Sequence, residues 1–81
     1  MATYQLTSWR ASWHPATKNH PAYAHVTIRG DAHHLLQKVH GWEAFNIPLE
    51  PHHKNDKKTI KELVQRAMQL SQNKWHGHIT V

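Results

Sequence analysis

Apolar and polar residues alternate along two short segments of the chain. Residues 23–29 (YAHVTIR) and 75–81 (WHGHITV) change side-chain character at almost every step. Because successive side chains of a strand point to opposite faces, each segment predicts a strand with one apolar and one polar face. The polar faces of the two strands hold His25, Thr27, Arg29, His76, His78 and Thr80.

The segment 3–13 is rich in Thr, Tyr, Trp and Leu, a composition typical of strands. Simple alternation would place Tyr4 and Leu6 on one face and Trp9 and Trp13 on the other. A β-bulge near Ser8 would bring the two pairs together. An edge strand with both faces partly covered is the alternative.

A helix is predicted to start near residues 56–59 and to end near Gln72 or Asn73. Thr59 and Glu62 have the spacing of a capping box. An apolar stripe follows at helical spacing. It consists of Ile60, Leu63, Val64, Ala67 and Met68.

A second, shorter helix is predicted over residues 32–40. Asp31 is a good N-cap residue, and Gly41 is a good residue to follow a helix. The apolar positions recur at helical spacing, at Ala32, Leu35, Leu36 and Val39. A third strand is the alternative for this segment. Residues 42–49 (WEAFNIPL) then predict a short edge strand, interrupted by Pro48.

These elements predict an α+β fold in the order β-β-α-β-α-β, forming one compact domain over residues 1–81. A small single sheet of three to four strands would have its helices packed on the apolar face. Its polar face would then be free to bind a partner. With only 81 residues, an extensive cleft between two lobes is not expected.

The charge balance indicates an anionic partner. Ten Lys and Arg residues against five Asp and Glu residues give a net charge of +5, and ten histidines can add to it. There is no cysteine, so disulfides, thiolate nucleophiles and cysteine zinc sites are excluded. The first residues (MATYQLTSWR) contain no apolar run of signal-peptide length, and no stretch approaches the length of a membrane span. We therefore expect a cytoplasmic protein without a membrane partner, with homo-oligomer formation as an open possibility.

Two tetrapeptides share one pattern, His25-Val26-Thr27-Ile28 and His78-Ile79-Thr80-Val81. On neighbouring strands they would present two imidazoles and two hydroxyls to one phosphate, as general acid, general base and phosphate ligands. The pattern resembles the paired His-x-Thr-x motifs of the 2H phosphoesterase family. That resemblance implies a metal-independent phosphodiesterase acting on RNA ends or cyclic nucleotides, with His25, Thr27, His78 and Thr80 as its catalytic residues.

Histidine pairs at residues 33–34, 52–53 and 76/78 suggest metal binding as another possibility. A specific structural site normally needs four ligands, and no spacing in the chain enforces such a set. We therefore expect neither a metal nor another cofactor.

The leading hypothesis is a small non-catalytic binding protein, an inhibitor or adaptor that contacts nucleic acid or the acidic surface of another protein. Cations and aromatic rings are the side chains such contacts use. Several lysines also cluster near the start of the helix predicted from residues 56–59 onward. The helix dipole disfavours cations at this end, and an external anion would offset that effect. The candidate partner-binding residues are Arg10, Arg29, Lys57, Lys58, Lys61, Trp9 and Trp13.

Overall fold

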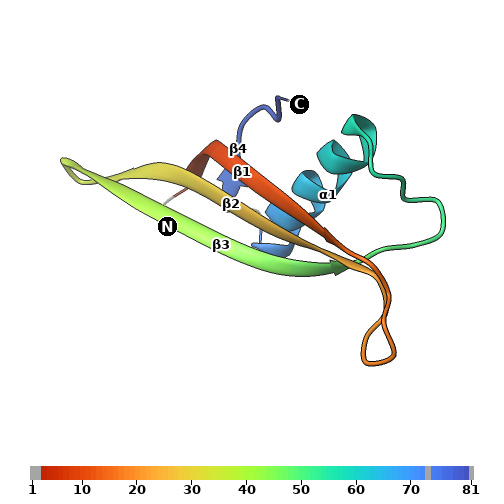
Figure 1. Cartoon of the computed structure of the whole chain (residues 1–81). Helices are drawn as coiled ribbons and strands as arrows, with labels where there is room; N and C mark the ends of the chain where they lie inside the picture. The colour runs from red at the N-terminus through yellow and green to blue at the C-terminus, as the bar shows by residue number, and fades with distance from the viewer. Residues whose placement is uncertain (1–2, 73, 81) are drawn as a thin grey trace.

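Three long antiparallel strands dominate the computed structural model, which describes residues 3–72 and 74–80 (Figure 1). They are followed by one helix and a two-residue strand. The elements are β1 (Tyr4–His14), β2 (Tyr23–His34), β3 (Gln37–Pro48), α1 (Lys57–Leu70) and β4 (Trp75–His76). The strands form one curled sheet in the order β3-β2-β1-β4, in which β4 runs parallel to β1.

A β-bulge in β1 brings its aromatic and aliphatic residues to one face, as the sequence predicts. Leu6 lies opposite Gly30 and Ser8 lies opposite Arg29, so Thr7 is the extra residue. The Thr7 hydroxyl donates a hydrogen bond to the carbonyl oxygen of Arg29, 3.2 Å away. As a result all the large apolar residues of β1 pack against the same core. These residues are Tyr4, Leu6, Trp9 and Trp13.

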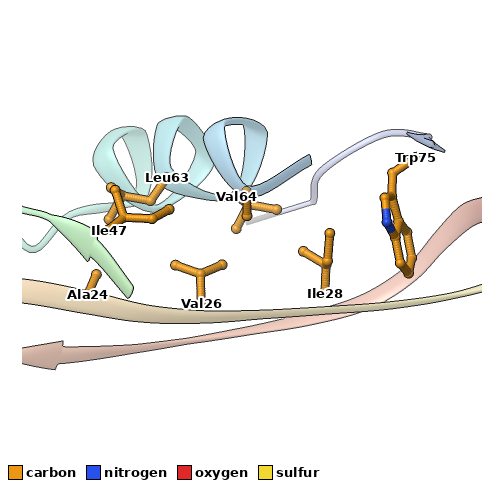
Figure 2. Close-up of a cluster of buried hydrophobic side chains, with 8 residues drawn as sticks. Ala24, Val26, Ile28, Ile47, Leu63, Val64 and Trp75 are labelled. Carbon is orange, nitrogen blue, oxygen red and sulfur yellow. The ribbon is translucent and has the colours of Figure 1, made fainter. Parts of the chain in front are cut away.

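The core lies between this face of the sheet and α1 (Figure 2). The alternation predicted for residues 23–29 is confirmed, since Ala24, Val26 and Ile28 are fully buried. Leu63 and Val64 of α1 point down onto them, so the predicted apolar stripe of this helix is also confirmed. The buried cluster consists of Ala24, Val26, Ile28, Ile47, Leu63, Val64, Ala67 and Trp75.

The two ends of α1 are held by side chains. Asp56 is the N-cap and accepts a hydrogen bond from the backbone N–H of Thr59, 2.9 Å away. The predicted capping box of Thr59 and Glu62 is wrong, because Asp56 is the N-cap and Thr59 already lies inside the helix. At the other end, the hydroxyl of Ser71 donates to the carboxylate of Glu43 on β3.

The predicted fold class is wrong: the described residues are mostly sheet and contain a single helix, in the order β-β-β-α-β. The expected helix over residues 32–40 is instead the end of a long β2–β3 hairpin. Ala32 and Val39 lie opposite each other across its strands, and residues 35 and 36 form the turn. A spacing of three and four residues fits a helix face, and it also fits a hairpin whose apolar residues pair across the turn.

Two glycines interpreted as element ends lie in the middle of strands. Gly30 and Gly41 are cross-strand partners in β2 and β3. The stacked rings of Tyr4 and Trp75, with centroids 5.0 Å apart, cover them. A Cβ atom on Gly30 would lie 2.6 Å from the ring of Trp75, and one on Gly41 would lie 2.5 Å from the ring of Tyr4. These glycines therefore make room for aromatic packing.

The C-terminal strand is shorter than predicted. Only Trp75 and His76 pair with β1, while the expected strand reached Val81, which lies outside the described residues. The segment 42–49 is an edge strand, as expected, but it forms part of the longer β3. Within the described ranges, no helix has the length and apolar character that crossing a bilayer requires.

Candidate functional site

The face of the sheet turned away from α1 carries the polar and charged side chains of all three long strands. We call this surface the outer face. Strand register places its residues, because Cα partners in antiparallel strands share a face. It comprises Ser8, Arg10, Ser12, His25, Thr27, Arg29, Asp31, His33, Lys38, His40, Trp42 and Asn46. No helix or strand of the described residues packs against it.

Two arginines lie near the centre of the outer face. Arg10 is opposite Thr27 and Arg29 is opposite Ser8, so the two guanidinium groups come from adjacent strands on a diagonal. Cross-strand diagonal neighbours are about 7 to 8 Å apart, a span that one phosphate group can bridge. These four residues, with Trp9, line a hollow of about 300 Å³. Both arginines are exposed, and within residues 3–72 and 74–80 neither forms an ion pair.

A second hollow adjoins the first. It has a volume of about 470 Å³ and shares Ser8 and Arg29 with its neighbour. One wall is Trp42, which lies opposite Arg29 across β2 and β3 and keeps 67% of its surface exposed. The outer face therefore presents an open aromatic ring beside an open guanidinium group.

Some of the other polar residues of the outer face form hydrogen bonds with one another. His25 and Asn46 are cross-strand partners, and their side chains share a hydrogen bond of 2.7 Å. Because one nitrogen of the ring and the amide oxygen are occupied, the amide N–H groups of Asn46 remain available as donors. Hydroxyl groups of Ser8, Ser12 and Thr27 add further donors and acceptors.

Asp31 is the acidic residue of the outer face. Its carboxylate lies 2.5 Å from Nδ1 of His40 and 3.4 Å from Nζ of Lys38. Partial desolvation opposes ionisation, but the hydrogen bonds and charges of His40 and Lys38 outweigh it and lower the pKa of Asp31. The carboxylate is thus held ionised by its neighbours, and the remaining cations of the face are not neutralised by it.

The structure divides the predicted partner-binding residues into three groups. Arg10 and Arg29 lie together on the outer face. The rings of Trp9 and Trp13 pack against the core on the opposite side of the sheet. The lysines are exposed on α1, the helix that covers the core side; they are Lys57, Lys58 and Lys61. Only the two arginines therefore belong to the site around Trp42.

Trp42 was not among the residues predicted to bind a partner. Its position follows from pairing with Arg29, which becomes visible only when residues 32–40 are recognised as a hairpin. An alternating pattern through residues 38–46, with Lys38, His40, Trp42 and Asn46 in one register, is the signal that could have identified this face.

The two His-x-Thr motifs are not brought together. His25 and Thr27 lie on the outer face of β2, and β1 separates β2 from β4. His78 instead lines a hollow with Lys61 and Met68 of α1, on the helix side of the sheet. The two imidazoles therefore do not face one common phosphate site.

A cluster of possible metal ligands lies in the loop before α1. One potential ligand atom from each of Glu50, His52 and His53 lies within 4.8 Å of the others. The Nδ1 atom of His53 accepts a hydrogen bond from the backbone N–H of Glu50, 2.9 Å away, and its Nε2 atom lies 3.6 Å from Glu62. With both ring nitrogens of His53 engaged, these contacts fasten the loop to α1 and leave that ring no free lone pair for a metal.

No protein family, curated protein or solved structure matches this chain. The functional argument therefore depends on the geometry and chemistry of the outer face.

Proposed function

We propose that this chain is a non-catalytic nucleic-acid-binding protein that uses the outer face of its sheet. The observation that carries the proposal is the pair Arg10 and Arg29, exposed and without ion-pair partners among the described residues, at the centre of an uncovered sheet face. Unpaired arginines on an exposed, polar surface are the side chains that neutralise phosphates and recognise base edges.

The composition of the face favours nucleic acid over an acidic protein surface. Ser8 and Thr27 line the same hollow as the two arginines, and their hydroxyl groups are of a kind that commonly binds phosphate. The exposed ring of Trp42 beside Arg29 offers a stacking surface for a base. Protein–protein interfaces usually have an apolar centre, whereas the centre of this face is polar.

The free end of the β2–β3 hairpin fits a nucleic-acid groove. It is a two-stranded ribbon over residues 32–39, and the major groove of B-DNA, about 12 Å wide, admits such a ribbon. The wider three-stranded part of the outer face would lie against the phosphates. Arg10, Arg29 and Asn46 would then be the residues that approach phosphates or base edges.

No phosphodiesterase activity is proposed. General acid and base must both lie within hydrogen-bonding reach of the reacting phosphate. The first motif lies within β2, the second follows β4, and β1 lies between these two strands. Because His78 is also on the helix side of the sheet, His25 lacks the second histidine that such a mechanism requires.

Fluorescence anisotropy tests the proposal. Labelled duplex DNA, duplex RNA and single strands are titrated with the protein at salt concentrations from about 50 to 200 mM, the range over which phosphate contacts lose most affinity. We expect saturable binding whose logarithm falls linearly with the logarithm of salt concentration. Absence of binding at the lowest salt, or affinity independent of salt, would overturn the proposal.

A further inference from the structure

Two leucines form the tip of the β2–β3 hairpin and are fully open to solvent. His34 pairs with Gln37, so Leu35 and Leu36 are the whole turn. Leu35 is 88% exposed and Leu36 is 102% exposed. The hairpin end extends beyond the part of the sheet covered by α1, so the tip projects from the body of the protein (Figure 1).

The backbone of the tip is strained as well. Leu35 has a φ of 57°, in the left-handed region that a Cβ atom disfavours. Two-residue hairpin turns normally place Gly, Asn or Asp at such a position. A glycine or asparagine there would suit the turn better and expose less apolar surface. The fold therefore gives no reason for two leucines at this tip, and a partner outside the chain does.

A lysine, two histidines and the carboxylate of Asp31 line the outer face directly below the tip. His33 and Lys38 form a cross-strand pair, and His40 lies opposite Asp31 one position further down the same face. This row continues to Arg29 and Trp42. The apolar tip and the basic face therefore belong to one continuous surface, which matches a partner that is anionic outside and apolar within.

We propose that Leu35 and Leu36 form an apolar wedge that inserts between stacked base pairs of duplex DNA. This inference rests on the proposed function and assigns the bound form of the nucleic acid. Proteins that bend DNA insert side chains of this kind, Leu included, between base steps and kink the duplex. The outer face would hold the phosphates while the tip unstacks one step.

The reach of the hairpin agrees with this arrangement. Leu35 follows Arg29 by six residues, which corresponds to about 20 Å of strand. The grooves of B-DNA are only about 7.5 to 8.5 Å deep. The tip can therefore reach the base pairs while Arg29 stays at the phosphates, and the two-stranded end of the hairpin is narrow enough to enter a groove.

The test uses a duplex of about 25 base pairs carrying donor and acceptor dyes at its ends, because DNA of this length is stiff unless it is kinked. The wild-type protein should raise energy transfer on binding. The variant Leu35→Gly/Leu36→Ser should still bind the duplex through the outer face, more weakly than the wild type, and without raising energy transfer. Its Tm should equal or exceed that of the wild type, since glycine relieves the strain at residue 35.

The matched control is Leu70→Ser, which removes an exposed leucine from the end of α1, where 44% of its surface is accessible. This variant should bend the duplex as the wild type does. If the wild type binds the duplex without raising energy transfer, or the tip variant bends it equally, the wedge is refuted while the proposed function stands.

Two further outcomes also refute the wedge. If the wild type fails to bind any nucleic acid, the proposed function falls and the wedge falls with it. Sedimentation with phosphatidylserine–phosphatidylcholine vesicles tests whether the tip contacts a membrane instead of DNA. If the wild type sediments with them, the tip variant does not, and duplex DNA stays unbent, the tip is a membrane contact.

Discussion

Arg29 lies directly opposite Trp42 across β2 and β3, and both side chains leave the sheet on the face that α1 does not cover. Neither residue belongs to the buried core cluster, which lies on the other face of the sheet and includes Ile28 and Ile47. Their exposure side by side is what distinguishes the outer face from an ordinary solvated surface. The following predictions address this face and the packing that supports it.

Removal of either central arginine should weaken nucleic-acid binding. Arg10→Gln and Arg29→Gln should each reduce the slope of log affinity against log salt by about 0.9, the contribution of one phosphate contact. Arg66→Gln is the charge-matched control, because Arg66 is exposed on α1 and not on the outer face. Equal losses for Arg66→Gln and Arg29→Gln would mean that net charge alone determines binding.

Trp42 should contribute to binding without contributing to stability. Trp42→Ala should lower the affinity for single-stranded DNA by about 1–3 kcal/mol, the usual value of one base stacked on an aromatic ring. Because 67% of Trp42 is exposed, its loss should change the Tm little. Trp42→Phe should restore part of the affinity. A loss of Tm without a loss of affinity would contradict this role.

Asp31 should make the stability of the protein depend on acid. Its pKa is lowered in the folded state, so its contribution is complete above the unfolded value near 3.8 and is lost as the pH falls through the lowered pKa. Asp31→Asn should therefore show a smaller fall in Tm between about pH 5 and pH 2 than the wild type. Part of the fall should remain, because hydrogen bonds from Thr59 also lower the pKa of Asp56. An unchanged acid profile in Asp31→Asn would contradict the ion pairs with Lys38 and His40.

A methyl group at Gly30 should destabilise the protein. The added Cβ would meet the backbone carbonyl of Gln5 and the ring of Trp75, both fixed inside the sheet. Overpacking of this kind costs about 1–3 kcal/mol of the free energy of unfolding, which urea denaturation measures. Gly41→Ala is the matched comparison and should cost less, because its neighbour is the movable ring of Tyr4. Equal stability of Gly30→Ala and the wild type would show that the glycine pair is not needed for this packing.

The strands and the long helix could be predicted from the sequence where one face of an element is buried. Ala24, Val26 and Ile28 alternate with polar residues because α1 covers only one side of β2. The bulge near Ser8 was also predictable, since the large apolar residues of β1 need a common core. In these segments local pattern and tertiary packing agree.

The hairpin does not follow from the helical spacing of the apolar residues between 32 and 39, because that spacing indicates a helix only if those residues are buried. Leu35 and Leu36 are exposed, and they supplied the middle of the apparent helical stripe. Gly30 and Gly41 resemble the ends of a strand and of a helix. Their actual role is to make room for the rings of Trp75 and Tyr4, which are distant in sequence. With a helix expected over residues 32–40, the sequence does not place Trp42 beside Arg29. Trp42 lies on the outer face because of the register of β3 with β2.

The tryptophans show why the sequence alone does not assign its aromatic rings to one face of the sheet. Without the tertiary fold, Trp9, Trp13 and Trp42 are equally good candidates for an exposed aromatic ring. The bulge turns Trp9 and Trp13 inward, and the β2–β3 register turns Trp42 outward. Neither relationship follows from composition or charge.

Amide and indole N–H chemical shifts, recorded during titration of the labelled protein with duplex DNA, test the outer face most directly as the binding surface. We expect the largest changes at Thr27, Arg29 and the indole N–H of Trp42, with the indole of the buried Trp75 unaffected. Changes concentrated instead at Lys57, Lys58 and Lys61 would place the contact on α1 and contradict the account.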